Sequence, residues 1–107
     1  MTKKELIEFA EEFYAKGIST TKAKNADYTG GSDDPFSNFT CVEAYGVKSE
    51  HGFITRMSDK MKRISSFVTN GELQVKDESV TDTLQDLANY SMLFAAYIKS
   101  KSTNAQS

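Results

Sequence analysis

The segment that most constrains the fold is residues 77–101, near the end of the chain. Its apolar residues recur at nearly heptad spacing, which is the pattern of a long helix that packs along another helix. Beyond Asn89 its opposite side is apolar too, and a helix that is apolar all round is buried all round. We therefore predict a long helix covered by a loop or by another subunit. The bundle seam is predicted at Val80, Leu84, Leu87, Ser91, Phe94 and Ile98.

The start of the chain also predicts a helix. Residues 2–16 alternate apolar and acidic positions at helical spacing. Thr2 and Glu5 have the spacing of a capping box, which begins a helix, and Gly17 is a residue type that commonly ends one.

Two further segments predict helices. Residues 49–68 carry an apolar face at helical spacing, and the turn signal at Gly71 follows them. Residues 38–45 predict a short helix that Gly46 ends. No segment shows the alternation of a strand, so the expected fold class is all-α.

Residues 18–38 separate the first two predicted helices and are rich in Gly, Asp, Asn, Ser and Thr. Unstructured connections longer than about 12–15 residues are uncommon and usually functional or disordered. The aromatic residues Tyr28, Phe36 and Phe39 argue against disorder. We expect a long loop whose aromatic side chains either stack on a nucleotide base or anchor the loop on the bundle.

The length of the chain, 107 residues, is that of one domain. We predict a single helical domain over residues 1–101 and a disordered polar tail over residues 102–107. The apolar second half of the last helix further predicts a homodimer or a higher homo-oligomer.

Composition excludes several classes of protein. The formal charge of -2 argues against binding to duplex nucleic acid, which favours a basic excess. One cysteine and one histidine exclude a disulfide framework and a Cys/His zinc site within the chain. No apolar run approaches the roughly 18 residues that span a bilayer, and no signal region opens the chain. We expect a cytoplasmic protein that does not contact a membrane, in the bacterial host cytoplasm if a phage encodes it.

Three carboxylates in the last predicted helix recur every fourth residue, at Glu78, Asp82 and Asp86. This spacing places them on one face, about one turn apart. Because like charges repel, such a row needs a cation, a basic partner or open water. Mg²⁺ prefers oxygen ligands and often shares substrate phosphates, so it is a candidate cofactor.

A basic row in the helix at residues 49–68 could complement these acids. Arg56, Lys60 and Arg63 lie at the margin of its apolar face, where long side chains can reach a phosphate. The alternative is that the basic and acidic rows form exposed salt bridges between neighbouring helices, each worth roughly 0–1 kcal/mol.

Four stretches of the sequence together resemble a known family. They are KNADY at 24–28, DPFSNF at 34–39, RMSDKMKR at 56–63 and DESVTDTLQDLANY at 77–90. They resemble the phage and bacterial family called nucleotide modification associated domain, type one. The last stretch also resembles the second metal-binding helix of the MazG-like all-α nucleotide pyrophosphohydrolases.

The family resemblance implies a small helical protein of phage nucleotide metabolism. The MazG-like resemblance implies an oligomeric bundle that binds Mg²⁺ and splits a nucleoside triphosphate between its α and β phosphates. It assigns catalysis to Glu78 and Asp82, with Asp86 as a further metal ligand. The sequence departs from that pattern, because the preceding helix offers Asp59 and several bases instead of a second acidic pair. This departure favours recognition of an anionic nucleotide over hydrolysis.

Three functions are therefore expected. The first is a Mg²⁺-dependent nucleotide pyrophosphohydrolase or related enzyme. The second is a protein that sequesters a cyclic or signalling nucleotide of bacterial anti-phage defence, and the third is an accessory subunit of a DNA-modification system. The residues expected to hold the nucleotide are Arg56, Lys60, Arg63, Tyr28, Phe36, Asn38 and Asn89.

Overall fold

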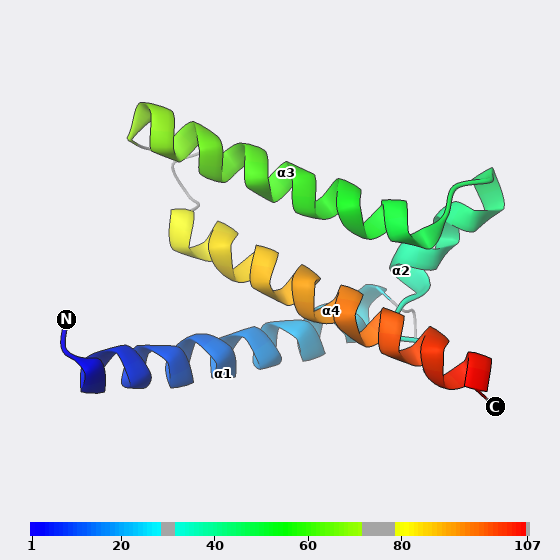
Figure 1. Ribbon diagram of the computed structural model, residues 1–107, viewed down its shortest axis with the longest axis horizontal. Coiled ribbons are helices and arrows are strands. Elements are labelled where there is room, and N and C mark those ends of the chain that lie inside the picture. The colour runs from blue at the N-terminus through cyan, green and yellow to red at the C-terminus, as the bar shows by residue number, and fades with distance from the viewer. Residues whose placement is uncertain (29–31, 72–78, 107) are drawn as a thin grey trace.

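The computed structural model describes residues 1–28, 32–71 and 79–106, with the backbone alone described at Tyr28 and at residues 103–106. Within these ranges every regular element is a helix, which confirms the all-α fold class (Figure 1). The elements are α1 (Lys3–Tyr28), α2 (Ser37–Thr40), the 3-10 helix η1 (Cys41–Tyr45), α3 (Ser49–Asn70) and α4 (Val80–Gln106).

Helix α4 lies between α1 and α3 and runs antiparallel to α3 (Figure 1). The contact of α4 with α3 is more extensive than its contact with α1. The short helices α2 and η1 pack against the beginning of α3. The result is a bundle in which α4 has a neighbour on two of its sides. None of the helices in the described ranges is apolar over enough of its length to cross a membrane.

Local signals set most helix boundaries. The backbone N–H of Glu5 donates to Thr2 Oγ1 at 3.1 Å, as the capping box predicts. Gly46 and Gly71 both adopt left-handed backbone conformations, with φ of 76° and 79°, directly after η1 and α3. Residues with side chains rarely adopt this conformation, so glycine suits both helix ends.

The prediction of a loop from residue 18 is wrong, because α1 continues past Gly17 to Tyr28. Gly17 is buried at the contact with α4. A Cβ atom at this position would lie 2.8 Å from Asn89 Oδ1. The glycine therefore permits a close approach of two helices and does not end the first one.

The core is a stack of aromatic rings. Phe53 is fully buried between Phe39 and Phe94, with ring centroids 4.1 Å and 4.8 Å away and nearly parallel planes. Tyr97 is also buried and contacts Phe53 at 5.3 Å. Because these residues come from α2, α3 and α4, the stack joins three helices.

Only part of the predicted seam of α4 faces its neighbours, because Phe94 stacks on Phe53 of α3 while other seam residues are exposed. Leu84 and Ile98 are 42% and 53% exposed, whereas Thr83 and Tyr97, one residue earlier in each case, are buried. One residue corresponds to about 100° around a helix. The helix buries the two sides that face α1 and α3, so Leu84, Ser91 and Ile98 of the heptad pattern are turned outward and leave a largely apolar row exposed.

The end of α4 extends to Gln106. Most of the segment 102–107, for which the sequence predicts a disordered tail, therefore has a helical backbone.

Candidate functional site

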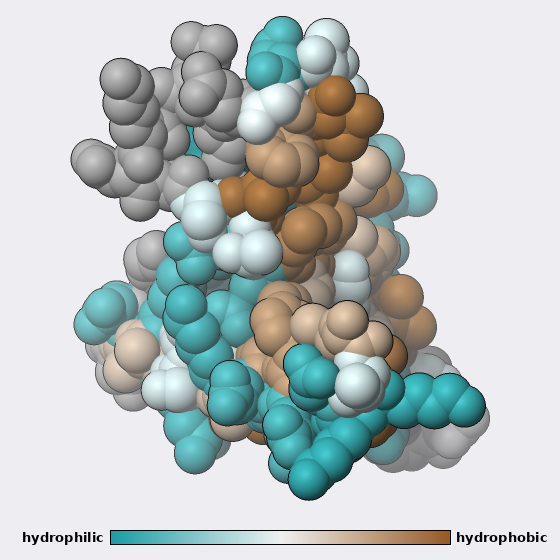
Figure 2. Space-filling view, turned by 90° about the vertical axis from the view of Figure 1, so that its left-hand side faces the viewer, coloured by the Kyte–Doolittle hydropathy of each residue, from teal (hydrophilic) through white to brown (hydrophobic). Residues whose placement is uncertain are grey.

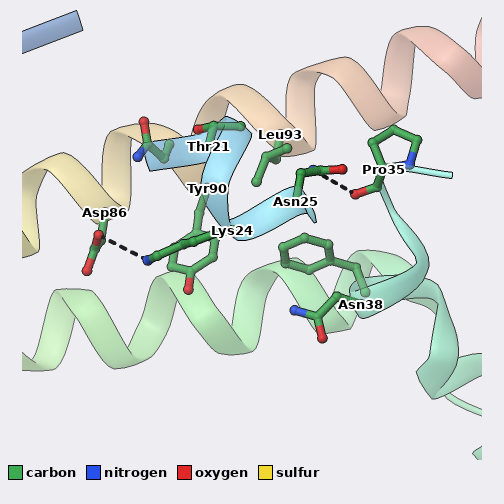
Figure 3. Close-up of a pocket in the computed structure, with 10 residues that line it drawn as sticks. Thr21, Lys24, Asn25, Pro35, Asn38, Asp86, Tyr90 and Leu93 are labelled. Atoms are coloured by element: carbon green, nitrogen blue, oxygen red, sulfur yellow. Dashed lines mark hydrogen bonds and ion pairs between the residues drawn. The ribbon is translucent and has the colours of Figure 1, made fainter. Parts of the chain in front are cut away.

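A pocket open to solvent lies between the end of α1, the start of α2 and the middle of α4 (Figure 3). Its cavity volume is about 40 Å³, and the space between its walls, open solvent included, is about 510 Å³. Its walls combine amide, charged and apolar side chains. They are Thr21, Lys24, Asn25, Pro35, Asn38, Phe39, Asp86, Asn89, Tyr90 and Leu93.

Charged groups from three helices meet at the rim of this pocket. The carboxylate of Asp86 lies 3.1 Å from Lys60 Nζ on α3 and 3.7 Å from Lys24 Nζ on α1. Figure 3 shows Lys24 reaching across to Asp86. The Arg56 guanidinium lies 5.8 Å from the ring centroid of Phe39, a pocket wall. Together these three basic groups and one carboxylate carry a net positive charge.

Uncharged polar groups line the interior of the pocket. Asn25 Nδ2 donates to the backbone oxygen of Pro35 at 3.5 Å (Figure 3). Asn38 and Asn89 supply two further amides. Thr21 Oγ1 is buried and has no hydrogen-bond partner among the described atoms.

The contact between α1 and α4 positions one of these amides. Gly17 leaves room for the side chain of Asn89, because no Cβ occupies the space. One turn earlier on α4, buried Gln85 donates from Nε2 to the backbone oxygen of Phe13 at 2.7 Å. Both contacts fix the rotation of α4 and thus direct Asp86 and Asn89 toward the end of α1.

Asp82 lies away from the pocket, at the beginning of α4. Its backbone N–H donates to Ser79 Oγ at 3.1 Å, and its Oδ2 accepts from the Ser79 backbone N–H at 3.4 Å. This reciprocal pair is a capping box, which starts the helix. Asp82 Oδ1 also lies 3.4 Å from Lys16 Nζ of α1.

A family model, the nucleotide modification associated domain 1, matches residues 42–99, which is more than half of the chain. The chain belongs to this family. No curated protein and no solved structure matches the chain.

The segment matched by the nucleotide modification associated domain 1 model contains the α4 wall of the pocket, which is four of its ten lining residues. Arg56, Lys60, Asp86 and Asn89 lie inside it, on α3 and α4. Lys24, which α1 adds to the same rim, lies outside it. The basic side of the pocket is therefore built mainly from the family segment.

The structure brings together several residues that the sequence assigns to nucleotide binding. Asn38 and Asn89 line the pocket, Lys60 lies at its rim, and Arg56 covers one of its walls. Half-buried Arg63 follows one turn after Lys60.

Phe36 is engaged elsewhere. Its ring packs edge-on against Tyr97, at 5.5 Å between centroids and 76° between planes. This contact anchors the connection before α2 on the bundle. The side chain of Tyr28 and all of Glu78 lie outside the described residues.

The sequence patterns gave no site role to Thr21 and Lys24, which share one face of α1 with Asn25. Their spacing, i, i+3 and i+4, places them on one face of a helix. The signal was present in the sequence, but the expectation of a loop after Gly17 concealed it.

The acidic row that the sequence predicts to bind magnesium is described at two of its three positions, Asp82 and Asp86. Among the described residues, no group of three acidic, histidine or cysteine side chains is arranged to hold a metal ion. Asp82 and Asp86, the two described members of the predicted acidic row, each lie within ion-pair distance of lysine. Both carboxylates thus have cationic partners from the chain itself.

Asp82 makes the stability of the domain depend on pH. Hydrogen bonds with Ser79, aided by Lys16, hold the pKa of Asp82 below its usual value. A carboxyl with a lowered pKa stabilises the fold fully above its unfolded pKa of about 3.9 and loses this effect as the pH falls through its folded pKa. We expect Asp82→Asn to lower the free energy of unfolding at pH 7. This difference from wild type should shrink below about pH 4.

Urea denaturation at pH 7 and pH 3, followed by circular dichroism, measures this difference. A difference that is the same at both pH values would contradict the role of the ionised carboxylate.

Proposed function

We propose that this nucleotide modification associated domain binds a nucleotide in the pocket between α1, α2 and α4 and releases it unchanged. The observation that carries the proposal is the arrangement at the rim, where Asp86 holds Lys24 and Lys60 side by side. The nucleotide phosphates lie against these ammonium groups, and the base enters the pocket.

The charge of the rim supports an anionic ligand. One carboxylate cannot neutralise two lysines, and Arg56 adds a third positive group nearby. Ionised donors form short, strong hydrogen bonds to phosphate oxygens. Lys60 is only 19% exposed, so solvent screens its charge less than that of a surface lysine.

The interior of the pocket suits a base or a sugar. Ligand pockets usually combine apolar walls with a few polar groups. Tyr90 and Leu93 supply apolar wall, while Asn38 and Asn89 offer both donors and acceptors. The family description, which refers to nucleotides, agrees with this ligand class.

Binding without hydrolysis is favoured over the Mg²⁺-dependent reaction because lysines already pair with the described acids. Asp82 belongs to a capping box, and Asp86 organises the rim. Two carboxylates with lysine partners are poorly disposed to take up a cation as well. Sequestration of a signalling nucleotide is the form of this function that the sequence analysis expects.

The test is isothermal titration calorimetry with linear and cyclic nucleotides, in Mg²⁺ and in EDTA, followed by chromatography of the recovered ligand. We expect binding in EDTA and intact ligand. Asp86→Asn should bind as tightly as wild type or more tightly, because it removes negative charge from an anion site.

Mg²⁺-dependent pyrophosphate release that Asp86→Asn abolishes would replace this proposal with the hydrolase. If no nucleotide binds, the accessory-subunit function is favoured instead.

A further inference from the structure

An apolar face formed by α3 and α4 has no partner among the described residues. On α3 the row is Ile54, Met61 and Val68, which are 48%, 52% and 76% exposed. On α4 the row is Leu84, Ser91 and Ile98. Members of each row are seven residues apart, so each row runs along its helix like the seam of a coiled coil. We call these two rows together the α3/α4 face.

The two rows lie on the same side of the molecule. Ile54 directly follows the buried Phe53, and Ile98 directly follows the buried Tyr97. Each row is therefore turned by about 100°, in the same sense, from the residues that join α3 to α4. Because the two helices are antiparallel, this rotation carries both rows to one side. Figure 2 shows hydrophobic surface continuing down one side of the molecule, from the level of α3 to that of α4.

The α3/α4 face carries no charge. Residues 87–98 of α4 contain no acidic or basic residue, and the α3 row consists of Ile, Met and Val. The ion pairs of α3 and α4 at Lys60 and Asp86 belong to the pocket side. A partner recognised by its charge would find no complement on this face. A second copy fits it, because a twofold axis sets a patch against itself and an uncharged apolar patch complements itself.

The size of the face is on the scale of a dimer interface. Helix α3 has 22 residues, which at 1.5 Å per residue gives a length of about 33 Å. Two helices side by side are about 20 Å wide, so the face projects roughly 650 Å². A stable interface buries about 800 Å² of accessible surface per partner, and accessible area exceeds projected area.

We infer that the α3/α4 face binds the same face of a second copy, so that α3 and α4 of both chains form a four-helix bundle about a twofold axis. The interface of the homo-oligomer that the sequence predicts is thereby assigned to the α3/α4 face. The pocket is lined by other residues of α4, among them Asp86, Asn89 and Leu93, and stays accessible in the dimer.

Sedimentation velocity of the full chain at about 50 µM tests the inference, with Ile98→Glu as the principal variant. We expect twice the chain mass for wild type and the chain mass for Ile98→Glu, because the dimer would bury the glutamate carboxylate. The matched control is Ile18→Glu on α1, where the isoleucine is 58% exposed, and it should remain dimeric.

Met61→Glu repeats the test from α3, and circular dichroism checks that each variant folds. A monomeric wild type overturns the inference. So does a dimer that both Ile98→Glu and Met61→Glu leave intact, or one that Ile18→Glu dissociates.

Discussion

Phe53→Ala is expected to lower the free energy of unfolding by about 3–5 kcal/mol, the usual cost of removing a buried aromatic ring. Phe53 is fully buried and stacks on Phe39 on one side and on Phe94 on the other. Its removal opens a cavity at the point where α2, α3 and α4 meet. Since small domains have only about 5–15 kcal/mol of stability, much of the fold depends on this ring.

Urea denaturation at a fixed protein concentration measures the effect of Phe53→Ala. The control is Phe9→Ala on α1, where the phenylalanine is 48% exposed and the loss should stay near 1 kcal/mol. Similar losses for both variants would show that the aromatic stack is not the centre of the fold.

Lys60→Ala is expected to weaken nucleotide binding by a factor of about 10 to 100. Hydrogen bonds that involve a charged group contribute about 1.5–3 kcal/mol, and 1.4 kcal/mol is a factor of ten in affinity. Lys60 lies 3.1 Å from Asp86 at the pocket rim. Its removal takes away a cation and also leaves Asp86 less neutralised, so that the carboxylate repels the phosphates.

Calorimetry with the nucleotide that binds wild type most tightly measures this loss. Lys62→Ala is the matched control, because exposed Lys62 is two residues away on α3 and so lies about 200° around the helix from Lys60, which pairs with Asp86. Its affinity should stay within about twofold of wild type. Equal losses for both variants would indicate a general effect of surface charge and would argue against a site at this rim.

Local sequence signals predicted the helix boundaries that depend on local chemistry. The capping box that begins α1 joins Thr2 and Glu5, which are three residues apart. The glycines with left-handed conformations directly follow η1 and α3, the helices that they end. The prediction that Gly17 ends the first helix was wrong, because this glycine instead permits the close contact between α1 and α4. Only the position of Asn89 in space reveals why a glycine lies there.

The sequence pattern also did not reveal which sides of α4 face α1 and α3. The heptad row predicts a seam, but a helix with two neighbours buries two sides, and the row that it leaves exposed can be apolar. Thr83 and Gln85 are buried although neither is apolar. Gln85 is accommodated because its amide donates to a backbone oxygen of α1.

The candidate site was predicted in part. The sequence identified Lys60, Asp86, Asn38 and Asn89 separately, and the structure places them around one pocket. It also proposed Asp82 as a neighbour of Asp86 in a single site. In the structure Asp82 pairs with Lys16, whereas Asp86, one turn further along α4, pairs with Lys24 and Lys60. Which lysine meets which acid depends on how α1 lies along α4, and no local pattern encodes that.

The shared carboxylate of Asp86 has a mechanical consequence. Lys24 belongs to the first helix and Lys60 to the third, and both attach to the same residue of the helix between them. A polyphosphate that contacts both ammonium groups would link α1 to α3. A ligand in the pocket would then restrict the motion of α1, whose contact with α4 is less extensive than that of α3.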